Sequence, residues 1–316
     1  MEYVEYWREQ KKRCIDGYWV SGRYMPGPLY FYVNFWMIKL KKEKGKGEFI
    51  GRPLLRDLEW EKSYIFLEAR GFSGFENDKK YTCDELYSPE VRSTNEGLGI
   101  IQKSDIEYVP AREYLRKIHP RSMGRPLFKN QAKNVIDIEA RGGGKSYFAS
   151  GAMIGWNFLF DGATSYEEYL DGIRNDEKLS SETLVGAIDA KYSKDLLSKV
   201  QLGFDNLKGS QEFNNQFIPS PLSKTFQGSF HPSKYIEAVR QVKSGKNWKV
   251  VGSRSKIHHR TFSDNPFAGN GTRPGISCFE EVGFWYNLEA TLGAMKETTA
   301  DGANKFGTIW MFGTGG

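Results

Sequence analysis

A lysine and a serine that follow three consecutive glycines are the residues of this chain best suited to bind phosphate. The apolar residues Val135, Ile136 and Ile138 predict a buried parallel strand, and the glycines lead from it into a helix. Such a turn points backbone N–H groups at a phosphate, and the start of the helix adds a favourable dipole potential. The expected phosphate-binding residues are Gly142, Gly143, Gly144, Lys145 and Ser146, with Lys145 on the β- and γ-phosphates and the Ser146 hydroxyl on Mg²⁺.

The turn departs from the P-loop consensus at its first position, where Glu139 replaces a glycine. The surrounding pattern still favours phosphate binding, because apolar residues recur at helical spacing after Ser146: Phe148, Ala152, Trp156 and Leu159. The alternative is a flexible glycine turn between two ordinary elements.

Two acidic residues end a second apolar run, which begins at Gly275. A carboxylate at the end of a core strand can hold Mg²⁺, and the next acid can polarise the attacking water. These roles fall to Glu280 and Glu281, although Asp is more usual than Glu at the first position. The alternative is an acidic helix cap or a solvated pair.

A third apolar run, 306–312, predicts another strand of the core and ends in Gly313, Thr314 and Gly315. A threonine at the tip of a strand beside the phosphate site could sense the γ-phosphate. The alternative is a simple glycine-rich loop.

Taken together, these motifs resemble the ATPase of the large terminase subunit of tailed double-stranded DNA bacteriophages, the motor that packages the viral genome. The resemblance rests on Arg141 four residues before Lys145, the two acids, the Gly-Thr-Gly-Gly ending, and the segments 271–274 and 28–34. It implies that Arg141 engages the γ-phosphate. It also implies that Glu280 is the Walker B acid, Glu281 the catalytic glutamate, and Thr314 with its flanking glycines the coupling motif.

The same resemblance implies ATP and Mg²⁺ as cofactors and sequence-independent double-stranded DNA as substrate. It further implies a portal protein and a small terminase subunit as partners, a ring on the procapsid, and the cytoplasm of the bacterial host. In dilute solution we expect a monomer. The family continues past the equivalent of Gly316 into a nuclease domain of RNase H type, so no DNA cleavage is expected from this chain.

The predicted fold class is α/β: a P-loop core with a mainly parallel sheet flanked by helices, and an N-terminal α+β subdomain. The expected boundaries are 1–130 for the subdomain and 131–316 for the core, truncated at its C-terminal end. Helices are also expected over 3–13, 54–71, 111–118, 191–202 and 287–299. A strand or short helix is expected over 30–38, a strand over 183–188, and a hairpin joining 248–252 to 255–262. Residues 162–182 are expected to form an exposed insertion.

Composition agrees with this reading. The chain has 316 residues, a net charge of +6 and three scattered cysteines, Cys14, Cys83 and Cys278. The charge suits a polyanionic partner, and the alternative is a mildly basic soluble protein without one. The odd cysteine count fits a reducing compartment better than a disulfide framework. The four histidines do not suggest a zinc site, and no segment has the length and apolarity of a membrane span.

Two other functions remain open. One is a different P-loop ATPase, such as a helicase-like protein or a small-molecule kinase. The other is a scaffold that binds nucleotide or DNA without turnover.

Overall fold

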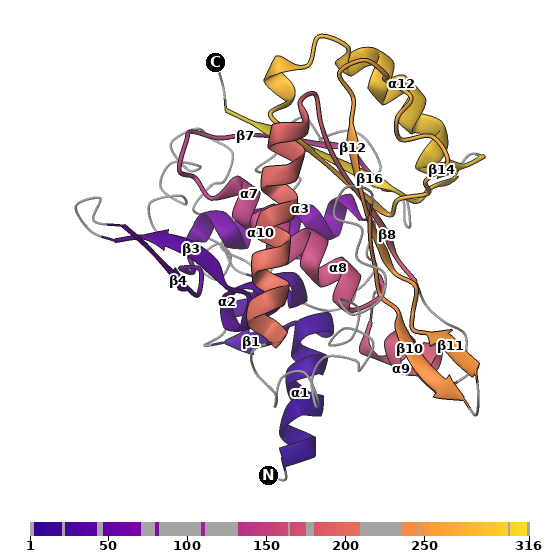
Figure 1. The fold of residues 1–316 in the computed structure, drawn as a ribbon. Coiled ribbons are helices and arrows are strands. Elements are labelled where there is room, and N and C mark those ends of the chain that lie inside the picture. Colours follow the sequence, from indigo (N-terminus) through magenta and orange to yellow (C-terminus); the bar gives the residue numbers. More distant parts are fainter. Residues whose placement is uncertain are drawn as a thin grey trace.

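A central mixed sheet with helices on both faces organises the chain in the computed structural model (Figure 1). The structure describes residues 3–20, 23–42, 47–70, 80–81, 109–110, 132–163, 165–174, 180–208, 235–244, 247–302 and 304–314. The expected helix over 111–118 and the residues Cys83 and Gly315 lie outside these ranges.

The central sheet has six strands in the order β7-β16-β13-β8-β12-β9. The first five are parallel to one another, and β9 pairs antiparallel with β12. This arrangement confirms the predicted α/β class and the mainly parallel sheet. The strands are β7 (Val135–Ile138), β8 (Glu182–Ala187), β9 (Tyr235–Glu237), β12 (Lys256–Thr261), β13 (Ile276–Glu280) and β16 (Thr308–Gly313).

Parallel pairing brings three chemically active segments to one edge of the sheet. The glycine turn follows β7, the acidic pair begins at the last residue of β13, and Thr314 follows β16. Since β16 lies between β7 and β13, these three segments leave adjacent strands at their carboxyl ends. Ligands bind at this edge in open α/β sheets.

Two apolar cores cover the two faces of the sheet. Along β16, Trp310 and Phe312 join the larger core, whereas Ile309 and Met311 join the smaller one. Side chains therefore alternate between the faces, as the pleat requires. The helices within the described residues are α1 (Tyr3–Asp16), α2 (Gly27–Phe35), α3 (Asp57–Ala69), α7 (Lys145–Phe148), η5 (Ala149–Gly155), α8 (Trp156–Leu159), α9 (Tyr166–Arg174), α10 (Ala190–Lys208), η7 (Val282–Phe284) and α12 (Leu288–Thr298).

The smaller core lies under α12, and the larger one lies under α10, the phosphate-turn helix and the N-terminal helices. Figure 1 shows α10 crossing the front of the sheet and the β3–β4 hairpin projecting to one side. The short antiparallel pairs are β1 (Tyr18–Val20) with β2 (Arg23–Met25), β3 (Ile38–Lys41) with β4 (Glu48–Gly51), β5 (Lys80–Tyr81) with β6 (Val109–Pro110), β10 (Arg240–Ser244) with β11 (Asn247–Val251), and β14 (Ala300–Asp301) with β15 (Asn304–Lys305).

The phosphate-turn helix runs without a break from Lys145 to Leu159, but its middle turns are π-helical rather than α-helical. Two glycines of the π segment, Gly151 and Gly155, lie against the indole of Trp36. A Cβ added at Gly151 would come within 2.5 Å of that ring, and one added at Gly155 within 2.7 Å. The indole of Trp36 is fully buried and also faces Gly203 of α10, so one N-terminal side chain packs against two core helices.

The prediction of a buried strand at 135–138 is wrong for half of its side chains. Ile136 and Ile138 are 63% and 69% exposed. The cause is the position of β7, which ends the six-stranded order, and its alternating pattern, which turns both isoleucines to the face away from the larger core. Asp137 points to the other face, toward α3.

The predicted hairpin around Gly252 is also wrong. Strand β11 pairs with β10, whereas β12 enters the central sheet beside β8. Residues 162–182 are not wholly exposed either, since Tyr169 of α9 is 2% exposed and packs against Phe160. For 30–38, the helix alternative is the correct one: α2 ends at Phe35, before β3 begins.

The remaining sequence predictions concern cysteines, metals and membranes. Cys14 and Cys278 are buried free thiols. In the described part of the chain, no three His, Cys, Asp or Glu side chains gather as a metal site, and no helix has the length and apolarity to cross a membrane. His259 instead shares a 2.7 Å hydrogen bond with Ser193.

Candidate nucleotide-binding site

The glycine turn has the backbone conformation that its glycines permit. Gly142 and Gly144 both have φ of +86°, in the left-handed region that side chains with a Cβ rarely adopt. The Gly143 N–H donates to the Ala140 carbonyl at 3.3 Å and closes the turn, and the Phe148 N–H donates to the Gly144 carbonyl at 2.9 Å to start the helix. The sequence therefore produces the predicted strand, turn and helix in the predicted order.

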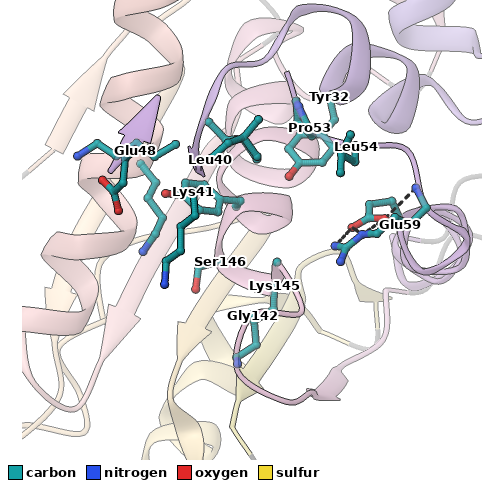
Figure 2. Close-up of a pocket in the computed structure, with 16 residues that line it drawn as sticks. Tyr32, Leu40, Lys41, Glu48, Pro53, Leu54, Glu59, Gly142, Lys145 and Ser146 are labelled. Carbon is teal, nitrogen blue, oxygen red and sulfur yellow. Dashed lines mark hydrogen bonds and ion pairs between the residues drawn. The ribbon is translucent and has the colours of Figure 1, made fainter. Parts of the chain in front are cut away.

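A pocket of about 430 Å³ opens beside this turn. Figure 2 shows Gly142, Lys145 and Ser146 on one side of it, with Leu40, Lys41 and Glu48 of the β3–β4 hairpin nearby. Tyr32, Pro53 and Leu54 add apolar surface, and Arg56, Glu59, Tyr147 and Lys199 complete the polar lining. The pocket is within the size range of small-molecule sites and combines apolar walls with a few polar groups.

Ser146, which lines the pocket, contacts Glu280, which does not line it and lies 134 residues away in the chain. The Ser146 hydroxyl donates to Glu280 Oε1 at 2.6 Å. Glu280 is 4% exposed, and its other oxygen, Oε2, is buried with no hydrogen-bond partner in the described part of the chain. Burial raises the pKa of Glu280 to about 7, and the hydrogen bond from Ser146 opposes the shift.

These two side chains fit a magnesium ion. A hydroxyl and a carboxylate oxygen are hard ligands of the kind Mg²⁺ takes beside the phosphates of a nucleotide. The unpartnered Oε2 is a buried acceptor whose desolvation a cation would offset. The predicted metal residues, Ser146 and Glu280, are thus brought together by the fold.

Glu281 and Thr314 also meet. Glu281 Oε2 accepts hydrogen bonds from the Thr314 backbone N–H at 3.1 Å and from the Thr314 hydroxyl at 2.9 Å. Glu281 has a left-handed backbone with φ of +53°, an uncommon conformation for a residue with a side chain. Such strain costs roughly 1–3 kcal/mol and is concentrated at functional sites.

For two of the predicted site residues, Arg141 and Gly313, the geometry gives less support for a role in the site. Arg141 lies exposed on the turn and is not among the residues that line the pocket. Gly313 would accept a Cβ at ordinary contact distances of 3.4–3.6 Å from the backbone of Val282 and Glu281, so neither space nor backbone conformation requires glycine there. Gly315 lies outside the described residues.

Sequence reasoning missed the contribution of the N-terminal segment to this site. Arg56 donates to the Gly143 carbonyl at 2.9 Å and forms an ion pair with Glu59, whose carboxylate also accepts from the Arg56 backbone N–H at 3.1 Å. The available signal was an Arg and a Glu three residues apart at the start of a predicted helix. That spacing suggests a helix cap, but it does not reveal which loop the arginine reaches.

Comparison with known proteins gives a limited result. Neither protein-family models nor curated protein sequences match this chain. Solved structures that resemble it include the large terminase ATPase domain of Thermus phage P74-26 and an arginine-to-alanine mutant of that domain. Both are 12% identical, with TM-scores of 0.34 and 0.35, and the match covers 57% of this chain and 59% of theirs.

The large terminase of bacteriophage HK97 is 14% identical with a TM-score of 0.31, and the match covers 58% of this chain and 29% of that one. Identities and scores at this level leave the function to be argued from the geometry of the site.

Proposed function

We propose that this chain is a Mg²⁺-dependent P-loop ATPase. The observation that carries the proposal is the contact between Ser146, the serine after the P-loop lysine, and Glu280, the acid at the end of a core strand. P-loop ATPases need these two groups together at one metal, and the order of the strands in this fold supplies the contact.

Each residue then has a role that follows from its chemistry. The turn and Lys145 bind the β- and γ-phosphates, and the pocket walled by the β3–β4 hairpin receives the rest of the nucleotide. Ser146 and Glu280 hold Mg²⁺, which neutralises charge that develops on the phosphate oxygens. Glu281 orients and polarises the attacking water, and Thr314 fixes the direction of its carboxylate.

We further propose that hydrolysis drives double-stranded DNA into a viral procapsid, as in large terminases. The direct contact between Glu281 and Thr314 supports this extension, because it joins the hydrolytic acid to the end of another core strand. The net charge of +6 suits a polyanionic substrate. A portal protein, a small terminase subunit and a ring of identical subunits belong to the same proposal.

The test is ATP hydrolysis by the purified chain with and without linear duplex DNA, alongside the Glu281→Gln variant. The proposal expects Mg²⁺-dependent turnover that rises with DNA of any sequence, and binding of ATP without turnover in the variant. ATP binding without any hydrolysis by the parent, with or without DNA, would favour a scaffold. Hydrolysis that depends on one DNA sequence would favour a site-specific protein.

A further inference from the structure

A carboxylate lies directly beneath the phosphate-binding turn. Glu139 occupies the position where the P-loop consensus has a glycine. Its side chain lies against Gly143, since a Cβ added to that glycine would come within 2.4 Å of Glu139 Oε2. An uncompensated negative charge here would repel the phosphates of a nucleotide.

A lysine from the N-terminal part of the chain compensates that charge. Lys62 of α3 is 3% exposed and forms an ion pair with Glu139. Its ammonium also lies 3.9 Å from Asp137 Oδ2, on the strand that leads into the turn. Burial raises the pKa of Glu139, Asp137 adds to the rise, and Lys62 opposes it.

Because the ion pair between Lys62 and Glu139 is buried, the loss of either charge matters more than it would at the surface. A buried charge without a partner is costly, and removing one member of a buried pair leaves the other uncompensated. The surroundings of Lys62 are partly apolar, since the centre of the Phe148 ring lies 5.6 Å from the ammonium. The position of Glu139 beneath Gly143 therefore depends on a residue 77 positions earlier in the chain.

The same helix holds the turn from a second side. Arg56, the residue before α3, donates to the Gly143 carbonyl at 2.9 Å. A Cβ added to the neighbouring Gly144 would come within 2.9 Å of the same guanidinium. Arg56 thus contacts the turn itself, and Lys62 of α3 contacts the acid beneath it.

We propose that Lys62 is a positioning residue of the phosphate site: it neutralises Glu139 and holds it beneath Gly143, so that the turn can accept the triphosphate of a nucleotide. This inference rests on the proposed nucleotide-binding function. It makes α3 part of the phosphate site and explains how a P-loop tolerates an acid at its first position.

The test is a double-mutant cycle read by calorimetric titration with Mg·ATP, on Lys62→Met, Glu139→Gln and the double variant. Lys62→Met should weaken ATP binding by about tenfold or more, because the acid beneath the turn is left unpaired. The double variant should regain most of the lost affinity, because the acid beneath the turn is gone and only Asp137, 3.9 Å from the ammonium, then lacks its partner. Glu139→Gln alone should bind at least as tightly as the parent, and Lys62→Arg should preserve binding.

Four results would overturn the inference. Lys62→Met could bind ATP with parental affinity, or a folded double variant could bind as weakly as Lys62→Met, which would make Lys62 a packing residue only. Should Lys62→Met fail to fold, a loss of more than threefold in Glu139→Gln would overturn it instead, because the acid itself would then support binding. A folded parent that binds no ATP would refute the proposed function as well, whereas the other results leave that function intact.

Discussion

The hydroxyl of Thr314 offers a sharp test of how the two acids after β13 are used. Replacing Thr314 with Val removes the 2.9 Å hydrogen bond to Glu281 but keeps the size of the side chain and the 3.1 Å bond from the backbone N–H. The control is Thr314→Ser, which retains the hydroxyl.

The magnitude follows from the environment of the bond. A hydrogen bond to a charged group contributes about 1.5–3 kcal/mol when buried. Both residues here are half-buried, so solvent screening reduces the contribution to about 1 kcal/mol. If that energy holds Glu281 toward the attacking water, turnover should fall about fivefold in Thr314→Val.

The assay is steady-state ATP hydrolysis at saturating Mg²⁺. We expect kcat to fall while KM for ATP changes less than about twofold, because Thr314 does not line the pocket. Thr314→Ser should stay within about twofold of the parent, and Thr314→Val should have no further effect once Glu281 is Gln. Parental turnover in Thr314→Val, or equal losses in the Val and Ser variants, would refute the role of this hydroxyl.

Three further predictions concern the metal, pH and packing. Glu280→Gln should raise the Mg²⁺ concentration for half-maximal turnover about tenfold, since the hydrogen bond to the neighbouring serine can persist while the charge is lost; an unchanged Mg²⁺ titration would exclude the carboxylate as a ligand. Burial among α1, α9 and the loop before β12 raises the pKa of Asp161 from 3.8 to about 6. Between these two pH values the folded protein keeps a proton that the unfolded chain releases. The free energy of unfolding should therefore fall by up to about 3 kcal/mol as pH rises from about 4 to 6, and Asp161→Asn should flatten this pH dependence. Melting scans in which the parent and the variant have the same pH dependence would contradict the assignment of this titration to Asp161. Gly203→Ala would place a Cβ 2.1 Å from the ring of Trp36. It should lower the free energy of unfolding by roughly 1–3 kcal/mol and the melting temperature by several degrees. Gly293→Ala, where the added Cβ meets nothing within 4 Å, should be neutral or stabilising by about 0.5–1 kcal/mol.

The pH prediction involves charged neighbours as well as Asp161 itself. Ser255 donates to the carboxylate at 2.7 Å, and Ser253 and the Lys11 ammonium also lower its pKa, although burial has the larger effect. The pKa of Lys11 is itself lowered to about 8 by burial. Since the unfolded chain binds that proton more readily, Lys11 contributes stability that is lost as pH falls from about 10.5 to 8, a window separate from that of Asp161.

The fold and the motif positions could be predicted because the relevant signals are local. A glycine turn between an apolar strand and a helical apolar pattern shows directly in the sequence around Lys145. The acids after β13 and the threonine after β16 are likewise located by the runs that precede them. Parallel pairing then brings these segments together, as the predicted sheet required.

What could not be predicted depends on contacts between distant segments. The pairing partner of β11 is β10, and nothing in the composition of 247–251 distinguishes that partner from β12. Lys62 reads as an ordinary polar residue of a helix, and only the packing of α3 against the turn makes it the partner of Glu139. The exposure of Ile136 reflects the place of β7 in the strand order, which its own residues do not specify.

The central claim is that this chain hydrolyses ATP at the turn containing Lys145. The most direct measurement is the rate of phosphate release from Mg·ATP by the parent, by Lys145→Ala, and by Lys296→Ala, which removes an exposed lysine of α12, whereas Lys145 is buried. The account predicts turnover in the parent and in Lys296→Ala, and none above background in a Lys145→Ala variant whose melting curve shows a folded protein. A folded Lys145→Ala variant that hydrolyses ATP at the parental rate would contradict it.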